Sequence, residues 1–175
     1  MNWRMGVSLV IIKKSAICDK DFELICQKIA ELERSVMPDD PWSATAIQEV
    51  LSQFGAGLLI NIEGEPNTDL SSAVIKGYCI YQIIFEDSEL HRIGTHPNFR
   101  RQGIARQLLD ELIYQVRQAH CQQLLLEVRD DNTAAIKLYH QVGLEPFGVR
   151  KNYYTSGETI CDALIMRLVL NNTKD

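Results

Sequence analysis

Three arginines lie in a short segment between an expected strand and an expected helix. The segment reads Arg100-Arg101-Gln102-Gly103-Ile104-Ala105-Arg106. An apparent strand over residues 90–95 precedes it, and apolar residues at helical spacing follow it. The first turn of a helix presents N–H groups without partners inside the helix, together with the positive end of the helix dipole. We therefore expect this junction to bind an anion, most plausibly a phosphate, with added donors from the arginines.

Two common phosphate-binding motifs do not fit this segment. A Walker loop needs Lys-Ser or Lys-Thr after its second glycine, and a dinucleotide fingerprint needs three spaced glycines, whereas only Gly103 is present. The segment instead resembles the turn Gln/Arg-x-x-Gly-x-Gly/Ala, by which the GCN5-related N-acetyltransferases hold the diphosphate of acyl-coenzyme A. An ordinary helix start with solvated arginines is the alternative that these residues alone leave open.

Further segments decide in favour of the coenzyme, because they resemble the GCN5-related N-acetyltransferases (GNAT). The pattern Asn-x-x-Ala-x-x-Leu-Tyr is present as Asn132-Thr133-Ala134-Ala135-Ile136-Lys137-Leu138-Tyr139. Other segments that carry the resemblance are Leu126-Glu127-Val128-Arg129, Gln141-Val142-Gly143-Leu144, Pro41-Trp42-Ser43, Arg150-Lys151-Asn152-Tyr153-Tyr154 and Asp162-Ala163-Leu164-Ile165-Met166. Within this superfamily the chain is most similar to the RimI-type enzymes, which acetylate the N-terminal alanine of a small-subunit ribosomal protein. The resemblance is strong from about residue 77 to 170 and thin before that.

The resemblance implies a fold, a co-substrate and a set of binding residues. Acetyl-CoA would be the donor, without any metal, and its pantetheine arm would lie where two central parallel strands separate near a bulge. The implied cofactor-binding residues are Ile93, Gly94 and Thr95 by their backbone, together with Arg101, Gln102, Gly103, Ile104, Ala105, Arg106 and Asn132. Capping of a helix explains Asn132 equally well. Gly94 departs from the residue that relatives usually carry, and we expect it to loosen the strand without removing the backbone contacts. His91 and Arg92 also depart from the usual residues, which leaves the acceptor specificity open.

Acetyl transfer to an amine needs a neutral nucleophile, a base and a proton for the leaving thiolate. An α-amine with a pKa near 8 is about one tenth neutral at pH 7, against about four in ten thousand for a lysine. That difference corresponds to about 3 kcal/mol and makes a protein N-terminus the easier substrate.

Glu127 is the candidate general base and Tyr139 the candidate general acid. Glu127 ends an apolar strand, where partial desolvation would raise its pKa toward the useful range. Pairing with Arg129, two residues on and therefore on the same face, is the structural alternative. Tyr139 follows Glu127 by twelve residues, as in the family's acid–base pair. A phenol stays protonated at neutral pH, although the ring could equally be a core residue.

Two other functions remain open. An acetyltransferase for a small amine, such as a polyamine or an aminoglycoside, would keep the same cofactor site but need more carboxylates around the acceptor. Residues 145–160 carry only Glu145 and Glu158, which disfavours it mildly. A catalytically silent acyl-CoA-binding module would not need both Glu127 and Tyr139. For Trp42, Tyr153 and Tyr154 we favour a role in packing over contact with the substrate.

The hydrophobic pattern predicts a single α/β (α+β) domain over residues 1–175. Strands are expected at residues 7–13, 57–63, 73–86, 89–95, 124–129, 147–152 and 163–170, and helices at 21–36, 44–53, 104–120 and 132–142. A tight hairpin connection is expected at Asp87-Ser88, and a loop longer than relatives need over 64–72. This order is that of the GNAT fold, a mixed and mostly antiparallel central sheet with helices on both faces.

Composition excludes several classes of protein. The net charge of −5 argues against direct nucleic-acid binding, and no apolar stretch reaches the length of a membrane span. The five cysteines are odd in number and scattered, which favours buried, inert thiols in a reducing compartment, and the histidines show no metal-ligand spacing. With no signal-peptide pattern, we expect a cytoplasmic enzyme, a monomer or weak homodimer, whose partner is the N-terminus of a ribosomal protein.

Overall fold

The computed structural model describes residues 9–12, 17–63, 71–156 and 159–170. The expected loop at 64–72 falls almost wholly outside these ranges. The elements follow the order predicted from the sequence. They are β1 (Leu9–Ile12), α1 (Asp19–Val36), α2 (Ala44–Leu51), β2 (Ala56–Glu63), β3 (Val74–Ile84), β4 (Asp87–Thr95), the short 3₁₀ helix η2 (Pro97–Phe99), α3 (Ile104–Gln118), β5 (Gln123–Arg129), α4 (Thr133–Gln141), β6 (Glu145–Ser156) and β7 (Thr159–Val169).

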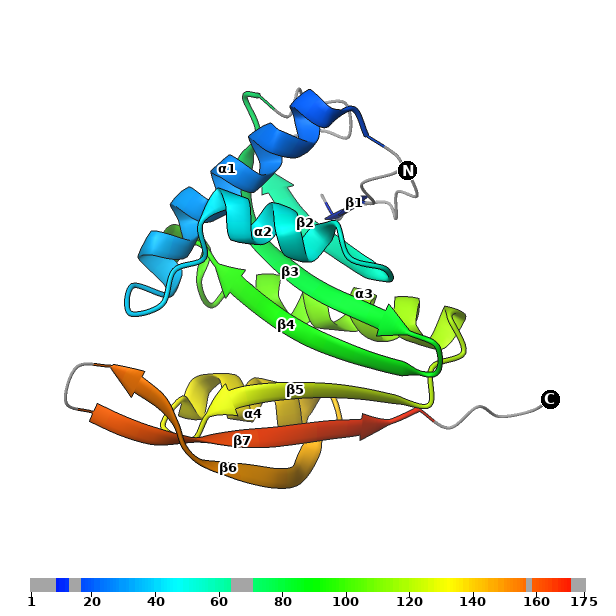
Figure 1. Cartoon of the computed structure of the whole chain (residues 1–175), viewed down its shortest axis with the longest axis vertical. Helices are drawn as coiled ribbons and strands as arrows, with labels where there is room; N and C mark the ends of the chain where they lie inside the picture. Colours follow the sequence, from blue (N-terminus) through cyan, green and yellow to red (C-terminus); the bar gives the residue numbers. More distant parts are fainter. Residues whose placement is uncertain (1–8, 13–16, 64–70, 157–158, 171–175) are drawn as a thin grey trace.

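The strands form one sheet in the order β1-β2-β3-β4-β5-β7-β6 (Figure 1). Among the described strands only β4 and β5 run parallel, and every other neighbouring pair is antiparallel. The predicted mixed, mostly antiparallel sheet is therefore confirmed. A parallel pair needs a long crossover, which α3 supplies between β4 and β5.

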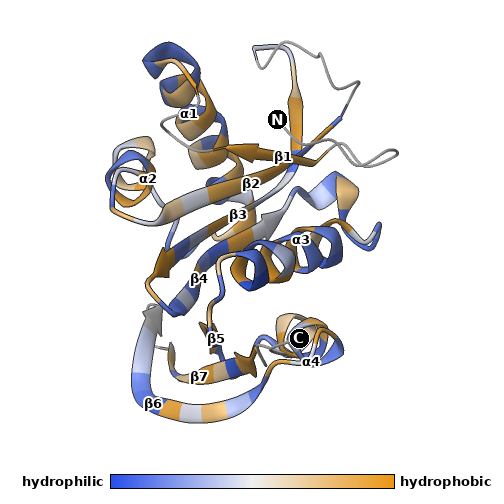
Figure 2. Ribbon diagram, turned by 90° about the vertical axis from the view of Figure 1, so that its right-hand side faces the viewer, coloured by the Kyte–Doolittle hydropathy of each residue, from blue (hydrophilic) through white to orange (hydrophobic). Residues whose placement is uncertain are grey.

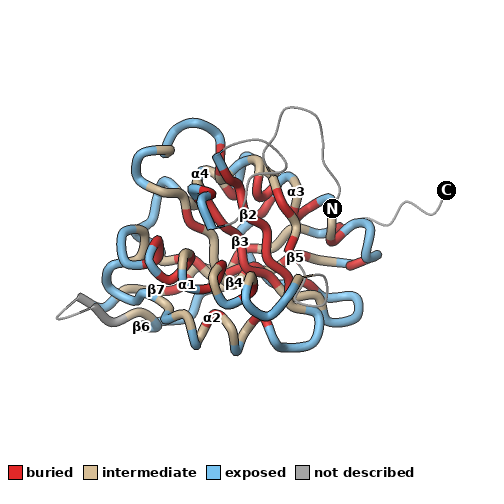
Figure 3. The backbone as a smooth tube through the Cα atoms, turned by 90° about the horizontal axis from the view of Figure 1, so that it is seen from above, coloured by how far each residue is buried: buried red, intermediate tan, exposed pale blue. Residues whose placement is uncertain are grey.

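Helices cover both faces of the sheet, as predicted, with α1 and α2 on one face and α3 and α4 on the other (Figure 2). Each face has its own apolar cluster. One joins α1 and α2 to the sheet through residues such as Ile29, Ile47 and Ile60. The other joins α3 and α4 to it through residues such as Leu108, Leu126 and Tyr139. The central strands are consequently the most buried part of the backbone (Figure 3).

Helix α3 shows why the periodic pattern was a reliable predictor. Its buried residues are those expected from the spacing, namely Ile104, Leu108, Leu109, Leu112, Ile113 and Val116. Residues three and four apart share one face of a helix, so this set forms a single apolar stripe. None of the helices in the described ranges is long and apolar enough to cross a membrane.

The hairpin between β3 and β4 was predicted two residues too late. Asp87 and Ser88 belong to β4, where they pair with Ile84 and Ile83, and the turn residues are Phe85 and Glu86. Phe85 adopts a positive φ of 54°. Such a conformation is unusual for a bulky residue, and no glycine or asparagine marks this turn in the sequence.

The prediction that the cysteines are buried is wrong for two of the five. Cys26, Cys79 and Cys121 are buried, whereas Cys18 is exposed and Cys161 is partly exposed. Cys18 instead occupies the N-cap of α1, and its sulfur accepts from the Asp21 amide at 3.5 Å. All five thiols are free.

Candidate functional site

The parallel strands β4 and β5 pair over only part of their length. Asp87 to Leu90 pair with Gln123 to Leu126, and the pairing ends there. In the β3–β4 register, Ile80 opposes Arg92 and Tyr81 opposes Leu90, so that His91 is an extra, bulged residue on β4. Since a bulge bends its strand, β4 turns away from β5 at this point, and the two strands diverge in Figure 1. The separation that the resemblance implied is therefore present.

Beyond the bulge, Ile93, Gly94 and Thr95 pair with β3 on one side only. Their other side is an open strand edge, which can pair with an extended molecule as an added strand would. The pantetheine arm of acetyl-CoA is such a molecule, since it carries two amide groups. The backbone contacts predicted for these three residues remain a prediction with a suitable geometry.

Gly94 has a packing reason that the sequence did not reveal. A Cβ atom at this position would lie 2.5 Å from Cε1 of Tyr78, the residue directly opposite on β3. Only glycine therefore lets the Tyr78 ring cross the strand. Gly94 therefore makes room for the Tyr78 ring, whereas the sequence suggested that it loosens the strand.

The predicted anion-binding turn lies between η2 and α3. Arg101 and Gly103 both have left-handed backbone conformations, with φ of 60° and 78°. Gly103 is the N-cap of α3, and no side chain caps the helix there. A Cβ atom on Gly103 would meet nothing within 4 Å, so the space in front of the turn is open. Uncapped amides, left-handed residues and open space are what a bound phosphate requires.

Two side chains of this turn, those of Gln102 and Arg106, already form hydrogen bonds with other residues. Gln102 donates to the carbonyl of Asn98 at 3.2 Å and thereby closes the turn. Arg106 donates from Nε to both carboxylate oxygens of Asp110, at 2.8 and 2.9 Å. Arg101 is exposed. Phosphate contact by Arg106 would require its side chain to leave Asp110, so Arg101 is the better placed of the two.

Glu127 lies on the part of β5 beyond the separation from β4. Its side chain is 22% exposed, and its Oε1 lies 3.1 Å from the Arg150 guanidinium on β6. The alternative pairing with Arg129 does not form, because Arg129 binds Asp131 with two donors, at 3.0 and 2.8 Å. Sequence reasoning missed Arg150, since strand pairing brings it close from a distant part of the chain.

Tyr139 is buried in α4, and its hydroxyl takes part in no hydrogen bond among the described residues. Burial raises the pKa of Tyr139 well above its ordinary value of 10, with Cys79 and Tyr154 adding to the effect. Burial also raises the pKa of Tyr154, and the Glu127 carboxylate adds to it. Tyr154 therefore lies within electrostatic range of both predicted catalytic residues.

Asn132 caps α4 as predicted. Its side-chain oxygen accepts from the Ala135 amide at 3.2 Å. This hydrogen bond accounts for an asparagine here and sets the start of the helix that carries Tyr139. A contact of Asn132 with the cofactor remains a prediction.

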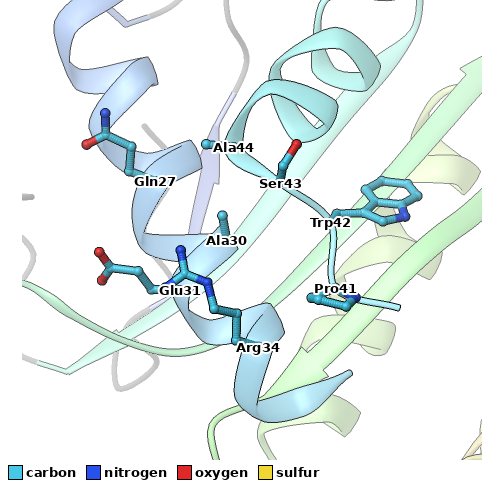
Figure 4. Close-up of a pocket in the computed structure, with 8 residues that line it drawn as sticks. All are labelled: Gln27, Ala30, Glu31, Arg34, Pro41, Trp42, Ser43 and Ala44. Atoms are coloured by element: carbon cyan, nitrogen blue, oxygen red, sulfur yellow. The ribbon is translucent and has the colours of Figure 1, made fainter. Parts of the chain in front are cut away.

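Two other features lie outside this region. Asp130, Asp131 and Cys161 place three potential metal-ligand atoms within 4.8 Å of one another, although Asp131 is already bound by Arg129. A hollow of about 330 Å³ lies between α1 and the start of α2 (Figure 4). It is lined by Gln27, Ala30, Glu31, Arg34, Pro41, Trp42, Ser43 and Ala44, so none of the predicted catalytic or cofactor-binding residues contributes to it.

The comparisons with known proteins agree with this geometry. A sequence profile of the acetyltransferase (GNAT) family matches residues 27–144. The chain belongs to this family. It is also 36% identical over 94 residues to the [ribosomal protein bS18]-alanine N-acetyltransferase of Escherichia coli strain K12. That stretch covers 54% of this chain and 64% of the E. coli protein, so the match spans just under two thirds of its relative.

Solved structures show the same GNAT fold over nearly the whole chain. The crystal structure of the E. coli ribosomal-protein-S18-alanine N-acetyltransferase superposes with a TM-score of 0.72 at 24% identity, covering 95% of this chain and 98% of that one. A GNAT family acetyltransferase from Elizabethkingia anophelis, solved with acetyl-CoA bound, gives a TM-score of 0.66 at 18% identity. It covers 95% of this chain and 100% of the other.

Proposed function

We propose that this GNAT protein transfers the acetyl group of acetyl-CoA to the N-terminal α-amine of a ribosomal protein that begins with alanine. The observation that carries the proposal is the separation of β4 from β5 at the His91 bulge, with Glu127 and Tyr139 beside it and the open turn at Gly103 at its end. The similarity to the E. coli alanine N-acetyltransferase supports the acceptor class.

The turn at the start of α3 would hold the diphosphate, and the free edge of β4 would hold the pantetheine arm. Backbone N–H groups at a helix start suit a diphosphate because they supply several donors and partial positive charge in one place. With both ends of the coenzyme fixed, its thioester lies in the gap between the two strands. Acetyl-CoA then supplies the activated acetyl group.

In the reaction, the neutral α-amine attacks the thioester carbonyl, and the carbon–sulfur bond breaks. Glu127 takes the proton of the amine, directly or through one water. The Tyr139 hydroxyl gives a proton to the leaving thiolate. Burial keeps this phenol protonated before the reaction and also makes it a weaker acid. Donation therefore requires that the thiolate be released directly beside this hydroxyl.

A peptide panel tests this function. The protein is incubated with acetyl-CoA and a set of peptides that share an internal lysine and differ only in their first residue, and mass spectrometry locates the acetyl group. We expect acetylation at the α-amine, fastest for the Ala-initiated peptide. An Ala-initiated peptide with a formylated N-terminus is the matched control and should remain unmodified. Acetylation of the internal lysine or of a free polyamine in preference to the α-amine would contradict the proposal.

A further inference from the structure

Arg92 follows the bulged residue of β4 and reaches across to the segment between α1 and α2, residues 37–43, called the α1–α2 linker below. Its side chain is only 12% exposed. The guanidinium donates to Asp40 of the linker at 2.6 Å. It also lies over the Trp42 ring, at 4.6 Å from the centroid. Stacking and a charged hydrogen bond together fix a flat guanidinium in one orientation.

Beneath this contact lies a fully buried carboxylate, that of Glu33 at the end of α1. It accepts from the Trp42 amide at 3.0 Å and from the Tyr78 hydroxyl, and Arg92 lies at 3.9 Å. A buried charge needs such partners, because an unpaired one is strongly destabilising. The linker is therefore held through both its backbone, at Trp42, and its side chains.

The same contacts reach the free edge of β4. Tyr78, which donates to Glu33, packs its ring against Gly94 so closely that no Cβ fits there. The Glu33–Tyr78 pair therefore connects the α1–α2 linker to the strand edge proposed to hold the pantetheine arm. A shift of Arg92 would disturb the linker first, since Glu33 keeps Tyr78 and Trp42 as partners.

The linker lies at the separation of the two strands, because Arg92, which binds it, directly follows the bulge where β4 turns away from β5. The pKa of Arg129, at the end of β5, is raised mainly by its hydrogen bond to Asp131, and Asp39 of the linker adds to it. The pKa of Tyr154 is raised by burial and by Glu127, while Arg92 acts in the opposite direction. Asp39 and Arg92 therefore lie within electrostatic range of Arg129 on β5 and Tyr154 on β6 respectively.

We propose that Arg92 is a positioning residue, which clamps the α1–α2 linker through Asp40 and Trp42 so that the linker forms the wall of the acceptor site opposite Glu127. This inference rests on the proposed function. Neither the bulge nor the cofactor turn depends on the clamp, so it acts on acceptor binding and leaves donor binding alone.

The test replaces Asp40, which is 78% exposed, because removing it breaks the clamp without leaving Glu33 unpaired. We expect Asp40→Asn to raise the KM for the acceptor peptide about three- to tenfold, since a loosened wall must be ordered on binding. The kcat and the KM for acetyl-CoA should stay within about twofold, and Asp40→Glu should restore the acceptor KM. An unchanged acceptor KM in Asp40→Asn overturns the inference.

Hydrogen exchange of the linker provides a readout that needs no acceptor, so the clamp can be judged even if no peptide is acetylated. Amides of residues 37–43 should exchange faster in Asp40→Asn, while those of α3 stay unchanged. Asp39→Asn is the matched control, because it removes the same charge from the same linker but leaves the Arg92–Asp40 pair in place. Equal effects of the two variants on exchange or on acceptor KM would show a general charge effect, and would overturn the role of Arg92.

Discussion

The carboxylate of Glu127 lies 3.1 Å from the guanidinium of Arg150, a contact that the sequence did not predict. The proposed base is held beside a cation on a neighbouring strand. A guanidinium at this distance orients the carboxylate. The pair is partly exposed, so its own contribution to stability is small. Its value would lie in holding the carboxylate in one orientation.

Replacement of Glu127 by glutamine separates proton transfer from shape. Glu127→Gln keeps the size of the side chain but cannot take up a proton from the amine. We expect kcat to fall by about 10²- to 10⁴-fold, the usual contribution of a positioned base. The Kd for acetyl-CoA, measured by calorimetry, should not change, because the proposed cofactor contacts lie on β4 and α3.

Two further variants distinguish a base from a salt-bridge partner. Arg150→Gln breaks the same ion pair but leaves the carboxylate, so its kcat should fall far less than that of Glu127→Gln. Glu145→Gln removes an equal charge from an exposed position at the start of β6 and should leave kcat unaltered. Equal losses in Glu127→Gln and Arg150→Gln would mean that the ion pair matters and proton transfer by Glu127 does not.

Among the elements of the fold, the turn from η2 into α3 has an unusual backbone conformation. It places two residues in left-handed conformations within a short stretch and leaves the start of α3 without a side-chain cap. A non-glycine residue in this conformation costs about 1 kcal/mol or more. Arg101 bears that cost, and Gly103 avoids it. An uncapped helix start is unfavourable by itself, and a bound diphosphate would satisfy its free amides.

Gly103→Ala tests this turn. The added Cβ meets no protein atom within 4 Å, so the protein should still fold, with a loss of about 1–2 kcal/mol in the free energy of unfolding from the positive φ. The methyl group would instead occupy space offered to the diphosphate. We therefore expect the Kd for acetyl-CoA to rise about tenfold, equivalent to about 1.4 kcal/mol.

Gly143 provides the matched control, because it also has a positive φ, 94°, but follows α4. Gly143→Ala should lower the free energy of unfolding by a similar amount, although its Cβ would come within 3.3 Å of Leu168. It should leave the Kd for acetyl-CoA unchanged. If both variants weakened acetyl-CoA binding equally, the effect would come from backbone strain, and the turn at Gly103 would have no special role.

The elements also show how far a sequence can predict such a site. Periodic apolar spacing predicted α3 residue by residue, because burial of a helix depends on its own sequence. The turn at Phe85 escaped prediction, since its residues carry no usual turn signal. Arg150 and Arg92 escaped it for a different reason. Their partners, Glu127 and Asp40, are brought to them by strand order and by helix packing, which spacing along the chain does not encode.

The whole sheet has two parts, joined by the short parallel pairing of β4 with β5, which is called the seam below. Strands β1 to β4 form one part and β5, β7 and β6 the other, and four residue pairs between β4 and β5 join them. The seam is short because β4 turns away from β5 at the His91 bulge, which leaves the gap proposed to hold the coenzyme. The apolar cluster beneath it runs across both parts, from Cys79 and Leu90 to Leu126 and Tyr139. This continuous core holds the two parts together where backbone pairing cannot.

That core contains several ionisable groups that burial keeps neutral. Burial raises the pKa of Tyr81 and Tyr139 above the ordinary value of 10 and that of Cys79 above 9. The pKa of Tyr78, which lies in the apolar cluster under α1 and α2, is raised as well, by burial and then by Glu33. The unfolded chain has ordinary values, so above about pH 9–10 it loses these protons while the folded protein retains them. The contribution of these groups to the free energy of unfolding should therefore be fully present below about pH 9 and decrease at higher pH.

We expect the free energy of unfolding, measured by urea denaturation, to be constant near pH 8 and to fall steeply above pH 10. Each retained proton adds about 1.4 kcal/mol per pH unit to the slope once the unfolded group is ionised. Tyr81→Phe removes one buried phenol and should reduce the slope by about that amount. Tyr153→Phe, which removes a phenol that is half exposed, should leave it unchanged. Because the buried phenols lie in the core that spans the seam, a slope insensitive to Tyr81→Phe would show that this core opens to solvent before the protein unfolds.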